Sequence, residues 1–220
     1  LKFFEFPALR QYFFVICNAM KTKTIKILER DFCIIKYRKL PLTFYIKEID
    51  EDIFYYPEIE SFYWIKLADF DNQRNDTSKK LISQIIKLVK ILEFEKIIFL
   101  GEINKPWVSK ITSKRKDYKP LIKSLEYFKE NKIWGKFNGG VEVSVKNLKQ
   151  FLPHYFMITR CDGGFFDFHF TDEKENIIFY IHYSGEIKIM TLNKKYNEKF
   201  KKAVKLLDFI DSSRNGSEKI

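Results

Sequence analysis

The chain has 220 residues, 45% of them apolar and 17% aromatic, and this content excludes disorder for most of the chain because it can bury a sizeable core. The formal net charge is +11, and no run approaches the roughly 20 apolar residues that a membrane-spanning helix needs. Three cysteines without a CxxC pair argue against a disulfide framework and a Cys-rich zinc site, which favours a reducing cytoplasm.

The first methionine is Met20, and we treat residues 1–19 as an N-terminal extension of doubtful native status. Its apolar run, Tyr12–Cys17, is short, and charged residues interrupt the approach to it. The extension therefore does not match a secretory signal peptide.

Strand-forming residues dominate the next part of the chain. β-branched and aromatic side chains are dense there, and prolines separate the runs. We expect strands at 24–38, 42–49, 53–56 and 61–70. A polar loop at 71–76 then ends this mixed β region.

The clearest helix covers residues 78–92. Its apolar residues recur at the spacing of one helical face, and lysines occupy much of the remaining surface. The apolar face comprises Leu81, Ile82, Ile85, Ile86, Val89 and Leu92. The short apolar run 96–100 predicts a buried strand, so helix and strand form an α/β unit. A second helix is expected at 120–131, with Pro120 in its first turn.

Glycines at 135–140 break the chain and indicate a boundary. We therefore divide the chain into subdomains 20–135 and 136–211 and a tail, 212–220. The second subdomain opens with a short strand at 141–143 and a short helix at 146–152 that Pro153 stops. Polar links of two to six residues then predict a four-stranded antiparallel meander. Its strands are 155–160, 165–170, 177–183 and 186–192.

Alternation along the meander places large apolar residues on one face. They are Phe166, Phe168, Phe170, Ile177, Phe179 and Ile181. A final helix at 194–209 covers this face with Phe200, Val204 and Leu207. The predicted fold class is α+β, with an N-terminal mixed β region containing the α/β unit and a C-terminal four-stranded antiparallel meander covered by a terminal helix.

No catalytic constellation emerges from the sequence. His169, His182 and Asp167 fall on the polar face of the meander, which is compatible with an acid–base or metal cluster, but we favour an ordinary half-polar sheet face. Cys161 lies in a turn with no base assigned to it. Carboxylates at 58, 60, 69 and 71 could serve a metal-dependent nuclease, but their spacing matches no nuclease motif. We expect no metal site and no cofactor, and we lean against an enzyme.

Charge is segregated along the chain. Residues 48–76 hold nine acids against two bases, and residues 79–136 hold fifteen bases against six acids. Aromatic residues lie among the acids, which is typical of a protein interface. The predicted protein-binding residues of this acidic block are Tyr55, Tyr56, Glu58, Glu60, Trp64 and Asp69. In the alternative interpretation, the aromatic residues of the block point into the core and the acids only face solvent along the strands.

The basic block suggests a different partner. Its loop 105–119 mixes cations with aromatic rings, as expected for phosphate contacts combined with base stacking. The predicted nucleic-acid-binding residues are Trp107, Lys110, Lys114, Arg115, Lys116 and Lys119, together with the lysine face of helix 78–92. A solvated loop, or one that pairs with the acidic block, is the alternative.

These features predict a non-enzymatic binding protein of bacterial type, located in the cytoplasm, that docks a macromolecule through charged faces. Its concrete form is a toxin-neutralising (immunity-type) or defence-accessory protein with a protein partner. The alternative is a nucleic-acid-binding protein that uses the basic loop and the lysine face. A metal-dependent nuclease is the third hypothesis.

Overall fold

The chain folds as an α+β protein built on an antiparallel sheet, as expected. A computed structural model describes residues 25–29, 42–46, 51–55, 59–70, 75–101, 105–163, 168–213 and 217–220. The eight-stranded sheet has the order β1 (Ile25–Leu28), β6 (Gly140–Ser144), β5 (Lys96–Leu100), β7 (His169–Asp172), β8 (Ile177–Ile181), β9 (Ile187–Thr191), β4 (Ser61–Leu67) and β10 (Phe209–Asp211). A separate two-stranded sheet pairs β2 (Leu42–Ile46) with β3 (Glu51–Tyr55).

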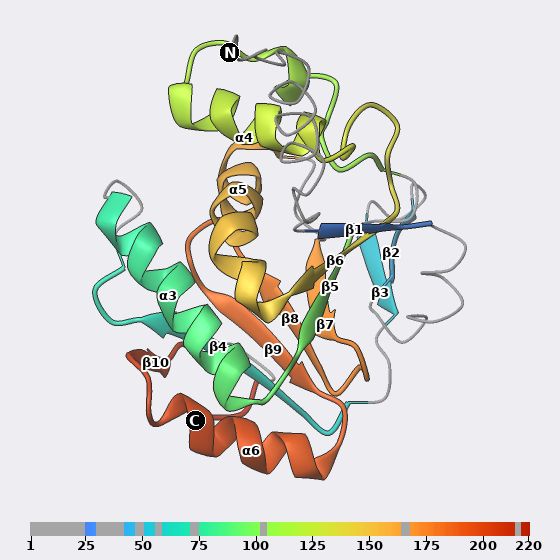
Figure 1. Cartoon of the computed structure of the whole chain (residues 1–220). Helices are drawn as coiled ribbons and strands as arrows, with labels where there is room; N and C mark the ends of the chain where they lie inside the picture. Colours follow the sequence, from blue (N-terminus) through green and yellow to red (C-terminus); the bar gives the residue numbers. More distant parts are fainter. Residues whose placement is uncertain are drawn as a thin grey trace, which may run out of the picture.

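Within the described ranges, four α-helices accompany the sheets: α3 (Asn75–Ile91), α4 (Lys119–Glu130), α5 (Leu148–Cys161) and α6 (Lys194–Val204). Short 3-10 turns precede α4 and α5, at η1 (Thr112–Lys114) and η2 (Val145–Asn147). Helices α3 and α5 lie side by side across one face of the large sheet, and α4 packs against α5 (Figure 1). No helix in the described part of the chain is long and apolar enough to cross a membrane.

The large sheet unites strands from both sides of residue 135. Strand β5 lies between β6 and β7, and β4 lies between β9 and β10. Helix α3 and strand β5 form the predicted α/β unit, and α3 follows β4 in the chain. The helix buries Leu81, Ile85 and Val89 of the expected apolar face, joined by Leu88, whereas Ile82 and Ile86 stay half-buried. The chain therefore crosses the sheet by way of α3, which fixes that helix over the middle strands.

The predicted helix at 146–152 is confirmed as helical, but its predicted stop at Pro153 is wrong. The predicted strand at 155–160 is also wrong, because these residues belong to the single helix α5. Pro153 lies inside this helix and removes one backbone donor, yet the helical pattern continues through it. The buried residues keep a helical spacing on both sides of the proline. They are Leu148, Phe151, Leu152, Tyr155, Phe156, Ile158 and Thr159. Burial of this stripe outweighs the local strand propensity of Tyr155–Arg160.

The other three strands of the meander are confirmed as β7, β8 and β9, with shifted registers. Phe170 pairs with Phe179, whereas a loop at 171–176 would pair it with Ile177. The shift is two residues, so the same side chains stay on the same face. Five of the six predicted residues on this face belong to the core, including Phe168, which lies just before β7. The sixth, Phe166, lies outside the described residues. The β8–β9 turn has three residues and ends at Gly185, whose φ of +85° suits glycine.

The final helix is shorter than predicted. It ends at Val204, and Phe209–Asp211 forms the edge strand β10 against β4. The chain then continues along the same edge, where the backbone N–H of Glu218 donates to the carbonyl of Phe62 at 2.8 Å. Phe200 and Val204 are buried as expected, while Ile210 is exposed on the edge strand.

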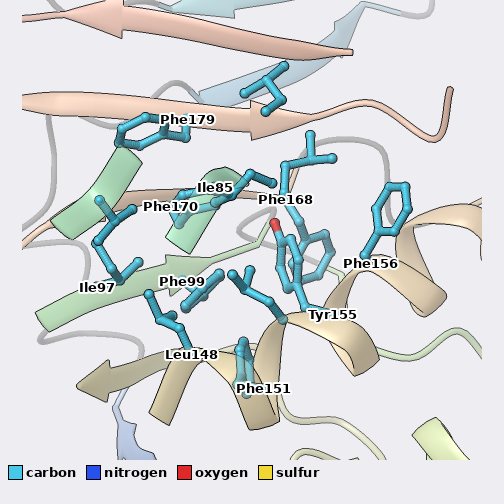
Figure 2. Packing of buried hydrophobic residues seen from close by; sticks show 14 of the residues in the cluster. Ile85, Ile97, Phe99, Leu148, Phe151, Tyr155, Phe156, Phe168, Phe170 and Phe179 are labelled. Atoms are coloured by element: carbon cyan, nitrogen blue, oxygen red, sulfur yellow. The ribbon is translucent and has the colours of Figure 1, made fainter. Parts of the chain in front are cut away.

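An aromatic cluster joins α5 to the sheet. The ring of Phe99 on β5 lies 4.7 Å from Phe151, 4.9 Å from Tyr155 and 5.0 Å from Phe170, measured between centroids. Figure 2 shows these rings packed between the helix and the strands. Offset and tilted ring pairs of this kind add stability beyond their buried area.

Trp107 belongs to the same core, which corrects its predicted role in base stacking. Its side chain is 1% exposed, and its indole N–H donates to the carbonyl of Gly139 at 2.8 Å. The ring packs edge-on against Phe168 at 5.0 Å. A buried indole offers no free face to a nucleobase, so this residue anchors the start of the basic loop.

Replacing Trp107 with alanine should lower the free energy of unfolding by about 3–5 kcal/mol, because it opens a cavity in a close-packed core. The matched control is Ile111→Ala in the same loop, where the side chain is 81% exposed. That change should stay within about 0.5 kcal/mol. Urea unfolding of both variants measures the difference, and equal effects would contradict the assignment of Trp107 to the core.

Candidate functional site

A hollow in the described surface lies between α3 and α5. The two helices run antiparallel, since Arg160 near the end of α5 donates to the hydroxyl of Ser78 near the start of α3 at 3.4 Å. At the other end, Lys90 of α3 and Lys146 of η2 line the same hollow. Its volume is about 830 Å³. We call it the basic groove.

The floor of the basic groove is apolar. Ile82 and Ile86, one turn apart on α3, form one side, and their side chains are half-buried. Met157 and the buried Phe156 of α5 form the other side. Pro120, Val145 and Pro153 complete the apolar lining. Aliphatic and thioether side chains therefore cover most of the floor.

The rim of the basic groove is cationic. Of the fifteen described residues that line it, six carry a positive charge and none carries a negative one. The cations are Lys79, Lys87 and Lys90 from α3 and Lys146, Lys149 and Arg160 from η2 and α5. In the part of the chain that the structure describes, none of the five rim lysines forms an ion pair with a carboxylate. These five lysines are thus available to an anionic ligand.

Four of the rim cations gather at one end of the groove. Lys87 and Lys90 lie in the last turns of α3, Lys146 lies in η2, and Lys149 lies at the start of α5. Like charges held close together repel one another, and an anion between them relieves this repulsion. Charge and shape together suit a ligand that is acidic on its flanks and apolar where it meets the floor.

The basic loop lies near the opposite end of the groove. Lys110, Lys114, Lys116 and Lys119 are exposed there, as the sequence predicted. Arg115 differs from them, because its guanidinium donates to both carboxylate oxygens of Asp117, at 3.0 and 2.8 Å, and to the carbonyl of Cys161 at 3.2 Å. These hydrogen bonds from Arg115 lower the pKa of Asp117. Arg115 therefore ties the loop to the end of α5.

The acidic block contributes few accessible aromatics among the described residues. Trp64 is 8% exposed on β4, so it is a sheet residue and a poor anchor for a partner. Glu60 and Asp69 are exposed, and Asp69 lies 3.9 Å from Lys80, an ion pair that joins the acidic and basic blocks. Tyr56, Glu58 and the side chain of Tyr55 lie outside the described residues.

The predicted polar cluster of the meander is not assembled as a metal site. His169 is buried on β7 opposite Tyr180, whereas His182 Nδ1 lies 2.6 Å from the hydroxyl of Ser184 in the turn after β8. Asp167 is outside the described residues. Across the described ranges, no group of three or more His, Cys, Asp and Glu side chains could hold a metal ion.

Cys161 is half-buried at the end of α5, with its Sγ 3.7 Å from Met157 Sδ. Burial raises the pKa of its thiol, so the reactive thiolate is disfavoured. This environment suits a packing role beside the groove floor.

Sequence reasoning missed half of the groove, because it assigned residues 155–160 to a strand. The missed lining residues of η2 and α5 repeat at helical spacing: Lys146, Lys149, Pro153, Phe156, Met157 and Arg160. This stripe was the available signal, and reading past Pro153 would have revealed it.

Comparison with protein-family models, with curated proteins and with solved structures finds no match to this chain.

His154 joins α4 to α5 next to the groove. Its ring stacks on Tyr127 with centroids 4.1 Å apart, and its Nδ1 lies 3.0 Å from Ser124 Oγ. Ser124 donates its hydroxyl proton to the carbonyl of Pro120, so Nδ1 carries the proton and donates to Ser124. Burial, helped by the charge of Lys123, lowers the pKa of His154 to about 4 from its ordinary 6.5.

This shift predicts a loss of stability in acid. The unfolded chain protonates His154 near pH 6.5, whereas the folded protein keeps it neutral down to about pH 4. The stabilisation is therefore complete above pH 6.5 and is lost as the pH falls towards 4. Between pH 7 and pH 4 the free energy of unfolding should fall by about 1–2 kcal/mol more in the wild type than in His154→Gln, allowing for solvent at the ring. Urea unfolding at both pH values measures this, and identical losses in the two proteins would refute it.

Proposed function

We propose that this protein is a non-enzymatic docking protein that holds an acidic protein partner in the basic groove. The observation that carries the proposal is the composition of the groove, whose described lining residues include six rim cations, no carboxylate and an apolar floor. Surface lysines speed association with an acidic partner, and the apolar floor supplies burial that slows dissociation. A cytoplasmic location is part of the same proposal.

The proposal keeps the predicted class of function and moves the docking surface. The sequence favours the acidic block, but its predicted aromatic anchor Trp64 is buried. Toxin neutralisation through that block stays a prediction, with Glu60 and Asp69 as its described exposed acids. The groove is the stronger candidate because its charge and its apolar surface lie in one concave site.

Charge reversal should locate the docking surface. The double variant Lys87→Glu and Lys149→Glu should weaken binding of fluorescein-labelled poly-L-glutamate by about tenfold or more at near-physiological salt. The matched control is Lys110→Glu with Lys114→Glu, which changes the net charge equally but lies on the loop and should weaken binding by less than about twofold. Fluorescence anisotropy gives both affinities. Equal losses in the two variants would mean that poly-L-glutamate senses only the overall charge, and would overturn the groove proposal.

Nucleic-acid binding through the basic loop is the second candidate. It is favoured by the exposed ammonium groups of Lys110, Lys114 and Lys116 on a loop that Arg115 ties to the body. The burial of Trp107 weakens it, because stacking is then left to Tyr118, which is 36% exposed.

Salt dependence tests this second candidate. If Lys114 and Lys116 contact phosphates, Lys114→Ala with Lys116→Ala should reduce the slope of log affinity against log salt by about 1.4–1.8 for a single-stranded or duplex probe. Anisotropy titrations with labelled DNA and RNA from low to near-physiological salt measure the slope. An unchanged slope would rule out the loop as a nucleic-acid site. The control is the groove variant, Lys87→Glu with Lys149→Glu.

A further inference from the structure

We infer that the ligand of the basic groove is an acidic amphipathic α-helix of the protein partner, an inference that rests on the proposed function. The proposed function requires only an acidic protein segment. The walls, the floor and the rim of the groove restrict the conformation and the residue pattern of that segment.

The walls exclude an extended ligand that pairs through its backbone. Both walls are helices, α3 and α5, whose interior backbone N–H and C=O groups are already bonded within the helix. The groove therefore offers no sheet edge for strand addition. A segment lying on the apolar floor must satisfy its own backbone groups, and a helix does so.

The floor predicts apolar residues along one stripe of the ligand helix. Ile82 and Ile86 lie at i and i+4 on α3, and Pro153, Phe156 and Met157 lie at i, i+3 and i+4 on α5. These rows form a channel between two helical ridges, into which the i, i+3, i+4 and i+7 side chains of a third helix fit. Met157 can adapt to side chains of different shape.

The rim predicts acids on both sides of that stripe. Lys79, Lys87 and Lys90 border the groove on the α3 side, and Lys146, Lys149 and Arg160 border it on the other. A helix with its apolar face down directs the two flanks of that face at these rims. Glutamates at the flanking positions would therefore meet cations from both walls.

The length of the groove sets the length of the ligand. Lys79 and Lys90 are eleven residues apart on α3, which corresponds to roughly 16 Å, or three helical turns. The cation-rich end attracts the negative end of the ligand helix dipole. The ligand helix should therefore run parallel to α3, with its C-terminus near Lys90 and Lys146.

A nucleic acid fits the same groove less well. Its phosphates could reach the rim, but the floor presents aliphatic side chains. Among the described lining residues the one aromatic ring, that of Phe156, is 2% exposed. Bases would find no ring face to stack on. The apolar floor would then stay uncovered, and the chemistry of the floor therefore favours a protein helix.

The test uses the full chain and two labelled peptides of about 14 residues. One carries leucines at i, i+3, i+4 and i+7 with glutamates on both flanks, and the other has the same composition in scrambled order. The amphipathic peptide should bind at least about tenfold more tightly and gain helicity on binding. Ile86→Gln should weaken it by about fivefold or more. The control, Leu206→Gln, changes a side chain that is 74% exposed elsewhere and should leave the affinity unchanged.

The outcomes separate this inference from the proposed function. If both peptides bind equally and both weaken with Lys87→Glu and Lys149→Glu, the helix inference is wrong while charge-driven docking stands. If a single-stranded DNA displaces the peptide with equal affinity, the ligand class is wrong. If neither peptide nor poly-L-glutamate binds, both proposals fail. If Ile86→Gln fails to fold, the comparison of the two peptides on the wild-type protein still tests the helix inference.

Discussion

The packing of α5 against the large sheet determines where the basic groove, our proposed docking surface, lies. Phe151 and Tyr155 on the inner side of α5 meet Phe99, which in turn contacts Phe170 on the next strand (Figure 2). This ring contact fixes the rotation of α5, and α3 packs beside it on the same face. The outer sides of the two helices are then left to form the basic groove. A change that rotated α5 would separate the two rims without removing a single charge.

Much of the fold followed from local patterns, and the main error came from one residue. The helices around Leu81 and Leu121 and the buried strand 96–100 had clear periodicity and boundaries, so they were confirmed. Pro153 predicts a helix stop, because an interior proline removes a backbone hydrogen bond and crowds the preceding turn, yet α5 continues through it. The stability gained by packing the buried stripe of α5 against Phe99 depends on tertiary contacts, which a local stretch of sequence does not reveal.

The candidate site was less accessible from the sequence than the fold. The lysines of α3 were singled out correctly as a basic face, but their partners on α5 come about 60 residues later and meet them only through tertiary packing. Exposure also cannot be read from residue type. Trp107 and Trp64 looked like surface anchors, yet both are core residues because strong hydrophobicity, in a chain with this much apolar area to bury, draws them inside.

The most direct test of the account maps an acidic ligand onto the surface of the intact protein. Two-dimensional ¹H–¹⁵N NMR during titration with the amphipathic acidic peptide should shift the amide signals of Ser83, Lys87, Lys149 and Met157, which line the groove. Signals from the basic loop, such as that of Ser113, should stay in place. Shifts confined to the loop, with the groove signals unchanged, would contradict the claim that the groove between α3 and α5 is the docking site.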